Sequence, residues 1–118
     1  MGEYDIENDY WVAAECHIND NFLAFSKVVY LPNQDILVMG GLDDSVPNKP
    51  SFVNKVVSLT ELPMNIYESV YSPTTLASMK TKRGCFSAIY SHGTQLVYVF
   101  GGLNYADKIL KKCEVYNL

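Results

Sequence analysis

The sequence contains a long internal repeat, marked by two Gly-Gly doublets, and this repeat constrains the fold more than any other feature. The doublets Gly40-Gly41 and Gly101-Gly102 lie 61 residues apart in a chain of 118 residues. When segment 25–42 is placed on segment 86–103 without a gap, seven of the eighteen positions are identical. Most of the other pairs keep their residue class. The chain therefore contains two copies of one structural unit.

Each copy consists of segments that are typical of β-strands. Segments 22–30 and 85–91 are rich in aromatic and β-branched residues, and a polar turn follows each of them. The next segments, 36–39 and 96–100, are continuously apolar, which predicts strands that are covered on both faces. These strands end at the glycine doublets, and glycine permits the positive φ and close backbone approach that a bulge or crowded axis requires.

A third strand is expected after a variable loop in each copy. The strands at 55–59 and 112–116 align when Leu59 is placed on Tyr116, a shift of 57. The loop of the first copy is therefore longer by four residues. Length variation at one loop between equivalent strands is typical of a binding face.

This order of strands, doublet and loop resembles the kelch repeat. Met79 to Gly84 is similar to the Met-x-x-x-Arg motif at the start of a kelch blade, and Val115-Tyr116-Asn117 is similar to the motif that ends its third strand. Tyr4-Asp5 and Trp11 resemble the residues that close a preceding blade. The resemblance implies an all-β fold, a partial kelch-like β-propeller with antiparallel four-stranded blades.

Under this interpretation the chain has three parts. Residues 4–14 are the end of a preceding blade, 22–81 form one complete blade with long loops, and 83–118 form the first three strands of the next. Leu59 stands where the pattern has Tyr, and the fourth strand falls in the weakly patterned stretch 60–78. Because a closed propeller needs about four to eight blades, we expect a fragment of about two.

Charge and hydropathy narrow the classes of partner. Nine basic against thirteen acidic residues give a net charge of −4 and a pI near 5.0, which excludes a general nucleic-acid binder because such proteins need a concentrated positive face. The N-terminus lacks the pattern of a secretory signal. The apolar run 36–42 is far shorter than a membrane span. These features predict a cytoplasmic protein without a membrane partner.

The cysteines and histidines predict neither a metal site nor a catalytic centre. Cys16, Cys85 and Cys113 lack the spacing of a zinc site, which favours free thiols in a reducing compartment. Cys16 and His17 are adjacent and on a strand would point to opposite faces, while Cys85 and His92 flank the two ends of one strand. We expect no catalytic residues, no metal and no cofactor.

The candidate binding residues lie in loops after the doublets and in a basic segment. Asp43-Asp44 and Asn104-Tyr105 occupy equivalent loops, and Arg83 lies beside Lys80 and Lys82. Solvated carboxylates are favoured at Asp43-Asp44 over a cation site. By resemblance to kelch proteins that bind peptides through rim loops and arginines, we expect these five residues to contact partners. Gly40, Gly41, Gly101, Gly102, Tyr116 and Trp11 are expected to be structural.

The function expected from the resemblance is a noncatalytic protein–protein interaction module, a scaffold or a ubiquitin-ligase substrate adaptor. Its partners are other proteins and neighbouring blades of the same or another chain. The alternative is a fragment of a kelch-propeller enzyme, an oxidase or sugar isomerase, whose active site lies in missing blades. An antiparallel sandwich that binds carbohydrate is a third interpretation, but it predicts no doublets at the ends of equivalent strands.

Overall fold

The chain is an all-β protein. The computed structural model describes residues 2–13, 15–16, 23–63, 69–104 and 108–118. Within these segments every regular element is a β-strand and no helix occurs, which confirms the predicted all-β class. In the described segments, therefore, no helix has the length and apolar character that a membrane span requires.

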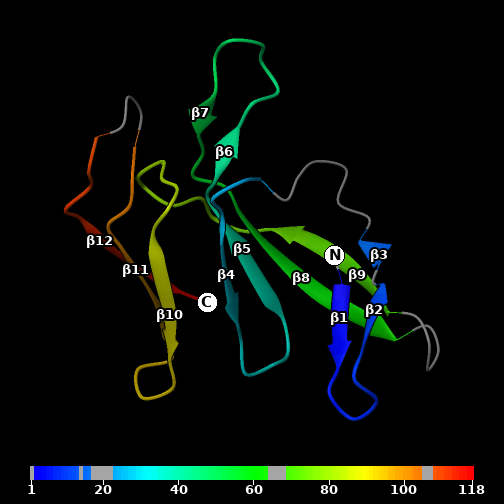
Figure 1. The fold of residues 1–118 in the computed structure, drawn as a ribbon. Helices are drawn as coiled ribbons and strands as arrows, with labels where there is room; N and C mark the ends of the chain where they lie inside the picture. The colour runs from blue at the N-terminus through cyan, green and yellow to red at the C-terminus, as the bar shows by residue number, and fades with distance from the viewer. Residues whose placement is uncertain (1, 14, 17–22, 64–68, 105–107) are drawn as a thin grey trace.

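The first large sheet has five strands in the order β3-β9-β8-β5-β4 (Figure 1). Its four antiparallel strands are β4 (Lys27–Tyr30), β5 (Ile36–Met39), β8 (Val56–Pro63) and β9 (Ser69–Thr75). The short strand β3 (Glu15–Cys16) pairs in parallel with the outer edge of β9. The strand β9 lies inside the stretch 60–78, where the sequence pattern was weakest, and it pairs with β8 from Val57↔Thr75 to Pro63↔Ser69.

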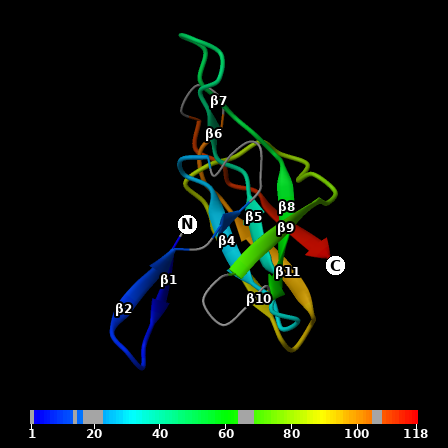
Figure 2. The same cartoon turned by 90° about the vertical axis from the view of Figure 1, so that its right-hand side faces the viewer.

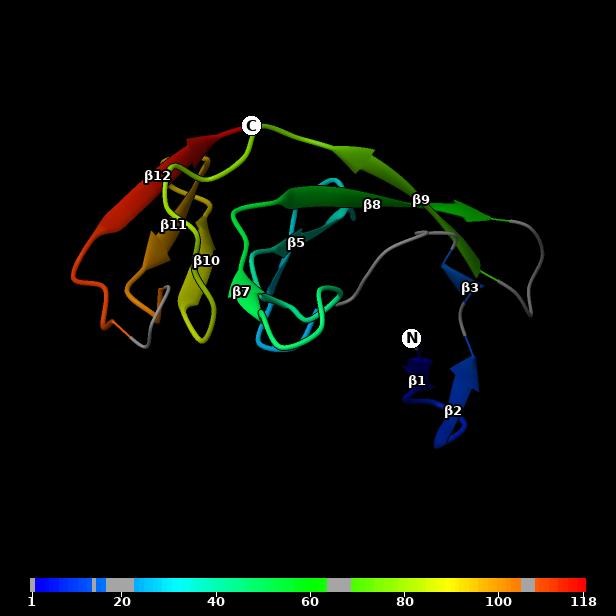
Figure 3. The same ribbon diagram turned by 90° about the horizontal axis from the view of Figure 1, so that it is seen from above.

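The second large sheet has three antiparallel strands in the order β10-β11-β12. They are β10 (Ser87–Ser91), β11 (Leu96–Phe100) and β12 (Cys113–Asn117). Figure 3 shows this sheet beside the first, with the connection after β9 passing from one to the other.

Two small hairpins complete the described structure. The hairpin of β1 (Gly2–Asp5) and β2 (Tyr10–Ala13) stands apart from the two larger sheets (Figures 2 and 3). The hairpin of β6 (Leu42–Asp43) and β7 (Ser51–Phe52) follows the first glycine doublet and projects beyond the end of β5.

The pairing registers show that β4, β5 and β8 are equivalent to β10, β11 and β12. Residues opposite one another across the three strands form the equivalent triplets Val28–Val38–Val57 and Ala88–Val99–Glu114. From β5 to β11 the shift is 61 and from β8 to β12 it is 57, since Val38 corresponds to Val99 and Val57 to Glu114. The predicted four-residue difference in loop length is confirmed.

The ungapped alignment of the first strands was wrong by one residue. Val28 corresponds to Ala88, a shift of 60, because Ala88 and Val99 are eleven positions apart whereas the equivalent Val28 and Val38 are ten apart. Phe25 therefore corresponds to Cys85 and not to Phe86. Phe25 and Cys85 share a positive φ, 62° and 51°. The side chains of Phe25 and Phe86, in contrast, differ in their exposed fraction, which is 58% for Phe25 and 7% for Phe86.

These two positive φ values also explain why β4 and β10 begin later than the segments predicted for them, 22–30 and 85–91. A left-handed residue cannot continue a strand, so the first strand of each copy starts two residues after Phe25 or Cys85.

The glycine doublets adopt the same backbone conformation in both copies. Gly40 and Gly41 have φ values of 62° and 110°, and Gly101 and Gly102 have 60° and 97°. A Cβ atom at Gly40 would overlap the Arg83 carbonyl oxygen, whereas one at Gly101 would have only the Leu110 carbonyl, at 3.5 Å, as a near neighbour. Both doublets end equivalent strands, as predicted, but close packing constrains Gly40 more strongly than Gly101.

The main core lies between the two large sheets. It is formed by buried apolar side chains from β4 and the turn after it, from β5, β8 and β11, and from the segment that connects the sheets: Val29, Leu31, Leu37, Met39, Val56, Met79, Phe86, Val97 and Val99. A second cluster on the opposite face of the first sheet contains Val38, Val57, Leu59 and Tyr71. The central strand β5 is therefore covered on both faces, as its continuous apolar sequence predicts, whereas the equivalent β11, for which the same was predicted, has Phe100 43% exposed on its outer face.

Candidate functional site

The segment that connects the two sheets is fixed to the first sheet by backbone hydrogen bonds. The Met79 N–H donates to the Asn54 carbonyl at 2.9 Å, and the Asn54 side-chain amide donates back to the Met79 carbonyl at 2.9 Å. Further along, the Arg83 N–H donates to Val53 and the Arg83 carbonyl accepts from Gly41. The backbone of Arg83 thus lies directly against the first doublet.

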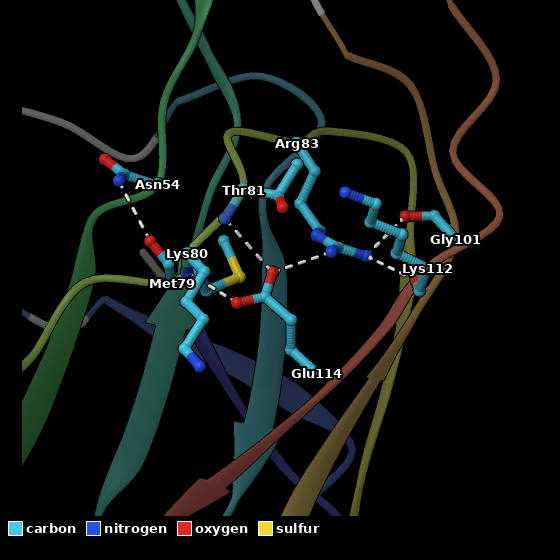
Figure 4. A network of polar contacts seen from close by, with 8 residues as sticks. All are labelled: Asn54, Met79, Lys80, Thr81, Arg83, Gly101, Lys112 and Glu114. Carbon is cyan, nitrogen blue, oxygen red and sulfur yellow. Dashed lines mark hydrogen bonds and ion pairs between the residues drawn. The ribbon is translucent and has the colours of Figure 1, made fainter.

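The side chain of Arg83 extends in the other direction and reaches the second sheet (Figure 4). Its guanidinium is fully buried. Nη1 donates to the carbonyls of Gly101 and Lys112 at 2.8 and 3.2 Å, and Nη2 makes a 2.7 Å ion pair with Glu114 Oε2. One residue therefore connects the first doublet, the second doublet and the start of β12.

Glu114 completes this network, and its role was missed in the sequence. Its carboxylate accepts the backbone N–H groups of Lys80 and Thr81, the latter at 3.2 Å, in addition to the bond from Arg83 (Figure 4). Glu114 stands where the first copy has Val57. A carboxylate at an inward-facing position of a repeated strand was the signal that could have revealed it.

Arg83 was predicted to contact a partner, and in the described structure its side chain is buried between the two sheets. A guanidinium that is 0% exposed and bonded to two carbonyls and a carboxylate has no surface to present. The resemblance to kelch proteins indicated that Arg83 is a functional residue, and the contacts that the structure shows for it hold the two sheets together. The neighbouring Lys80 and Lys82 are exposed.

The loop candidates lie where the sequence placed them, after the doublets. Asp43 pairs with Ser51 in the β6–β7 hairpin, and Asp44 is exposed beside it. Asn104 is half-buried, and its N–H donates to Lys108 at 2.9 Å. Tyr105 lies outside the described residues. The hairpin and the start of the second loop extend from the same end of the two sheets (Figure 1); partner contacts at these positions remain predictions.

The carboxylate of Asp43 is the described loop group with a perturbed pKa. Its Oδ1 accepts the Ser45 backbone N–H at 2.9 Å. This bond, with a second from the Ser45 side chain, holds the pKa of Asp43 below its ordinary value of 3.8 because both favour the charged form. The bonds close a tight Asx-type turn at the start of the hairpin.

The other candidates separate into distinct places. Tyr116 is half-buried and packs against the core between the sheets, and Trp11 lies in β2 opposite Tyr4. Cys85 and Cys113 are exposed free thiols. Among the described residues, no three His, Cys, Asp or Glu side chains form a group that could hold a metal ion.

A pocket of about 290 Å³ opens between the sheets beside β12. Its apolar wall includes Met39, Met79 and Val99, and its polar edge includes Lys80 and Glu114. A cavity of about 150 Å³ accepts a benzene molecule, so this pocket has room for a large aromatic side chain. The Glu114 carboxylate at its edge is already paired with Arg83.

Comparison with known proteins gives no family assignment. No family model matches the chain, and a search of the curated proteins finds no match. The functional argument therefore depends on the repeat and on the contacts described above.

Proposed function

We propose that the chain is a noncatalytic protein–protein interaction module, part of a kelch-like propeller that presents inter-strand loops to other proteins. The observation that carries this proposal is that each doublet, with matching φ values, ends an equivalent strand and is followed by a loop of different length. A constant framework with variable loops at one end is how binding surfaces are commonly built.

The outer face of the second sheet supports a propeller arrangement. Ile89 and Phe100 on this face are 59% and 43% exposed, whereas the equivalent Val29 and Met39 of the first sheet are 6% and 1% exposed because the second sheet covers them. The same face is therefore buried in one copy and open in the next. A neighbouring blade, of this or another chain, fits that open face.

A cytoplasmic scaffold or ubiquitin-ligase substrate adaptor is the specific role that we infer within this class. An adaptor needs a recruiting domain outside these residues. The second candidate, a kelch-propeller enzyme with its active site in other blades, is supported only by the breadth of functions that propellers carry. Copper analysis of the complete natural protein tests the oxidase form of this candidate, since an oxidase retains stoichiometric copper.

The binding proposal is tested by replacing the hairpin loop 44–50 with a Gly-Ser linker of equal length in the complete natural protein. The matched control replaces the turn 92–95, which lies at the opposite end of the second sheet. We expect proteins captured by the unmodified protein to be lost with the loop variant and kept with the turn variant. Equal capture by both variants contradicts binding through this loop.

A further inference from the structure

All nine basic residues of the chain lie at one end of the two large sheets, the end at which the glycine doublets stand. We call it the doublet end. Lys27 begins β4 opposite Met39, and the others lie in the β6–β7 hairpin loop, before β8, in the segment between the sheets and before β12, all at this end (Figure 1). The nine are Lys27, Lys49, Lys55, Lys80, Lys82, Arg83, Lys108, Lys111 and Lys112. The net charge of −4 is therefore distributed unevenly over the molecule.

Backbone hydrogen bonds hold the segments that carry these lysines against the doublets. The Gly40 N–H donates to the Lys55 carbonyl at 2.9 Å, and the Gly101 N–H donates to the Lys112 carbonyl at 3.1 Å. The segment between the sheets is attached to both doublets through Arg83. The lysine-bearing segments are therefore parts of one fixed framework.

Most of these basic residues are exposed, and the described carboxylates at the doublet end do not neutralise them. None of the exposed lysines is paired with a carboxylate of the described residues. Of the carboxylates described at this end, Glu114 is engaged by the buried Arg83, Asp43 is bonded to Ser45, and Asp44 is exposed. The surface of the doublet end is therefore strongly positive. Its exposed lysines are Lys49, Lys55, Lys80, Lys82, Lys108, Lys111 and Lys112.

The opposite end of the two sheets has the opposite charge. Asp35 and Glu61 line one polar pocket of about 260 Å³ there, and none of the nine basic residues lies at that end. The β1–β2 hairpin, residues 2–13, also contains four acidic and no basic residues. A charge distribution of this kind attracts an acidic partner to the doublet end and orients it as it approaches.

Exposed aliphatic side chains lie among the lysines. Val46, in the same hairpin loop as Lys49, is 55% exposed, and Ile109, beside Lys108, is 76% exposed. Nucleic acids are bound mainly through their phosphates, which offer no complement to these side chains. A polypeptide, in contrast, can place apolar residues between its carboxylates. The combination therefore favours a protein partner over a nucleic acid.

We propose that the doublet end binds a protein through a segment rich in Asp and Glu with apolar residues between them. The lysines pair with its carboxylates singly, since an ammonium group acts as a point charge, and Val46 and Ile109 contact its apolar residues. Arg83 takes no part, because its guanidinium is buried. The proposal rests on the proposed function, since it names the chemistry of the partner that these loops bind.

Binding is measured on the complete natural protein by fluorescence anisotropy. The probe is a labelled peptide of four Glu-Glu-Leu repeats, and the control is a peptide of four Gln-Gln-Leu repeats. We expect the dissociation constant of the probe to be lower by about tenfold or more. Added salt should raise it, because screening weakens the attraction between exposed charges. Equal binding of the two peptides, or no binding of either, overturns the proposal.

Two double variants with the same net charge test the location of the site. Lys82→Gln with Lys111→Gln removes two exposed positive charges from the doublet end, whereas Gln34→Glu with Gln95→Glu adds two negative charges to exposed turns at the opposite end. The first pair should weaken probe binding by about fivefold to tenfold, as expected for the loss of two exposed ion pairs, and the second by less than about twofold. Equal weakening means that only the total charge matters, and overturns the proposed site. Circular dichroism checks that both variants keep their strands.

Competition separates an acidic peptide from other anionic partners. Oligouridine RNA and vesicles of phosphatidylcholine with phosphatidylserine are each added to the complex with the probe, at an equal concentration of negative charge. We expect the probe to stay bound in both cases. Displacement by the RNA identifies a nucleic-acid surface, and displacement by the vesicles a membrane surface; either result overturns the proposal.

Failure of this inference is distinguishable from failure of the proposed function. If replacement of loop 44–50 abolishes protein capture but the probe does not bind, the chain binds proteins by other chemistry and only the acidic segment is wrong. If the probe binds as expected but capture does not depend on the loop, the proposed binding through this loop is wrong and the site for acidic peptides is supported.

Discussion

Removing the Arg83 guanidinium should strongly destabilise the fold. Arg83→Met keeps most of the side-chain length but deletes three hydrogen bonds that are made from a fully buried position. Losing one partner of a buried ion pair costs about 3–5 kcal/mol. Glu114 is 15% exposed and keeps its bonds from Lys80 and Thr81. We therefore expect a loss near the lower limit, about 3 kcal/mol of unfolding free energy.

Glu114→Gln tests the Arg83–Glu114 ion pair by changing its acidic partner. It preserves the shape of the side chain but leaves the charge of Arg83 buried without a carboxylate, and we again expect a loss of about 3 kcal/mol. In the double variant the two losses should not add, because both remove one interaction; a coupling energy of about 1–3 kcal/mol is expected for residues in contact.

The assay is urea unfolding followed by circular dichroism, with Lys82→Met as the control because Lys82 is an exposed neighbour in the same segment. The control should change stability by less than about 0.5 kcal/mol. An exposed ion pair contributes less than about 1 kcal/mol to stability. A loss that small for Arg83→Met would therefore refute the reasoning, and so would full additivity of the two losses in the double variant.

The doublets and the hairpin give two further predictions. Gly40→Ala should reduce stability by about 2–4 kcal/mol, because it adds overlap to a left-handed backbone, whereas Gly101→Ala should cost only about 1 kcal/mol; equal losses in urea unfolding would contradict the packing described at Gly40. Asp43 should titrate below 3.8 in an NMR experiment, so its bonds should persist above that pH and be lost as the pH falls through the lowered pKa. Ser45→Ala should raise the pKa of Asp43, and an unchanged value would mean that the Ser45 side chain makes no contribution.

The sequence predicted the repeat and its strands well because both depend on local chemistry. The apolar runs and the doublets are local features, and the structure has a strand in each segment that they predicted, although β4 and β10 begin later than predicted. The offset between the first strands could not be seen, because the identical Phe-Ser pairs at Phe25 and Phe86 suggested an ungapped match. The backbone resolves it: Cys85, not Phe86, shares the positive φ of Phe25.

The candidate site was predicted less well, since burial depends on contacts between distant segments. Arg83 lies in a basic stretch, and its sequence neighbours indicate a surface position. Its partners are the carbonyls of Gly101 and Lys112 and the carboxylate of Glu114, which lie 18 to 31 positions away. Only the stacking of the two sheets brings these groups around one guanidinium.

The central claim is that two copies of one sheet unit stack face to face, and inter-sheet NOEs measure this most directly. In a methyl-labelled sample, we predict NOEs from Val29 and Leu37 of the first sheet to Val97 and Val99 of the second. Cross-strand NOEs that confirm both registers, together with no NOEs between these two sets of methyl groups, would contradict the account.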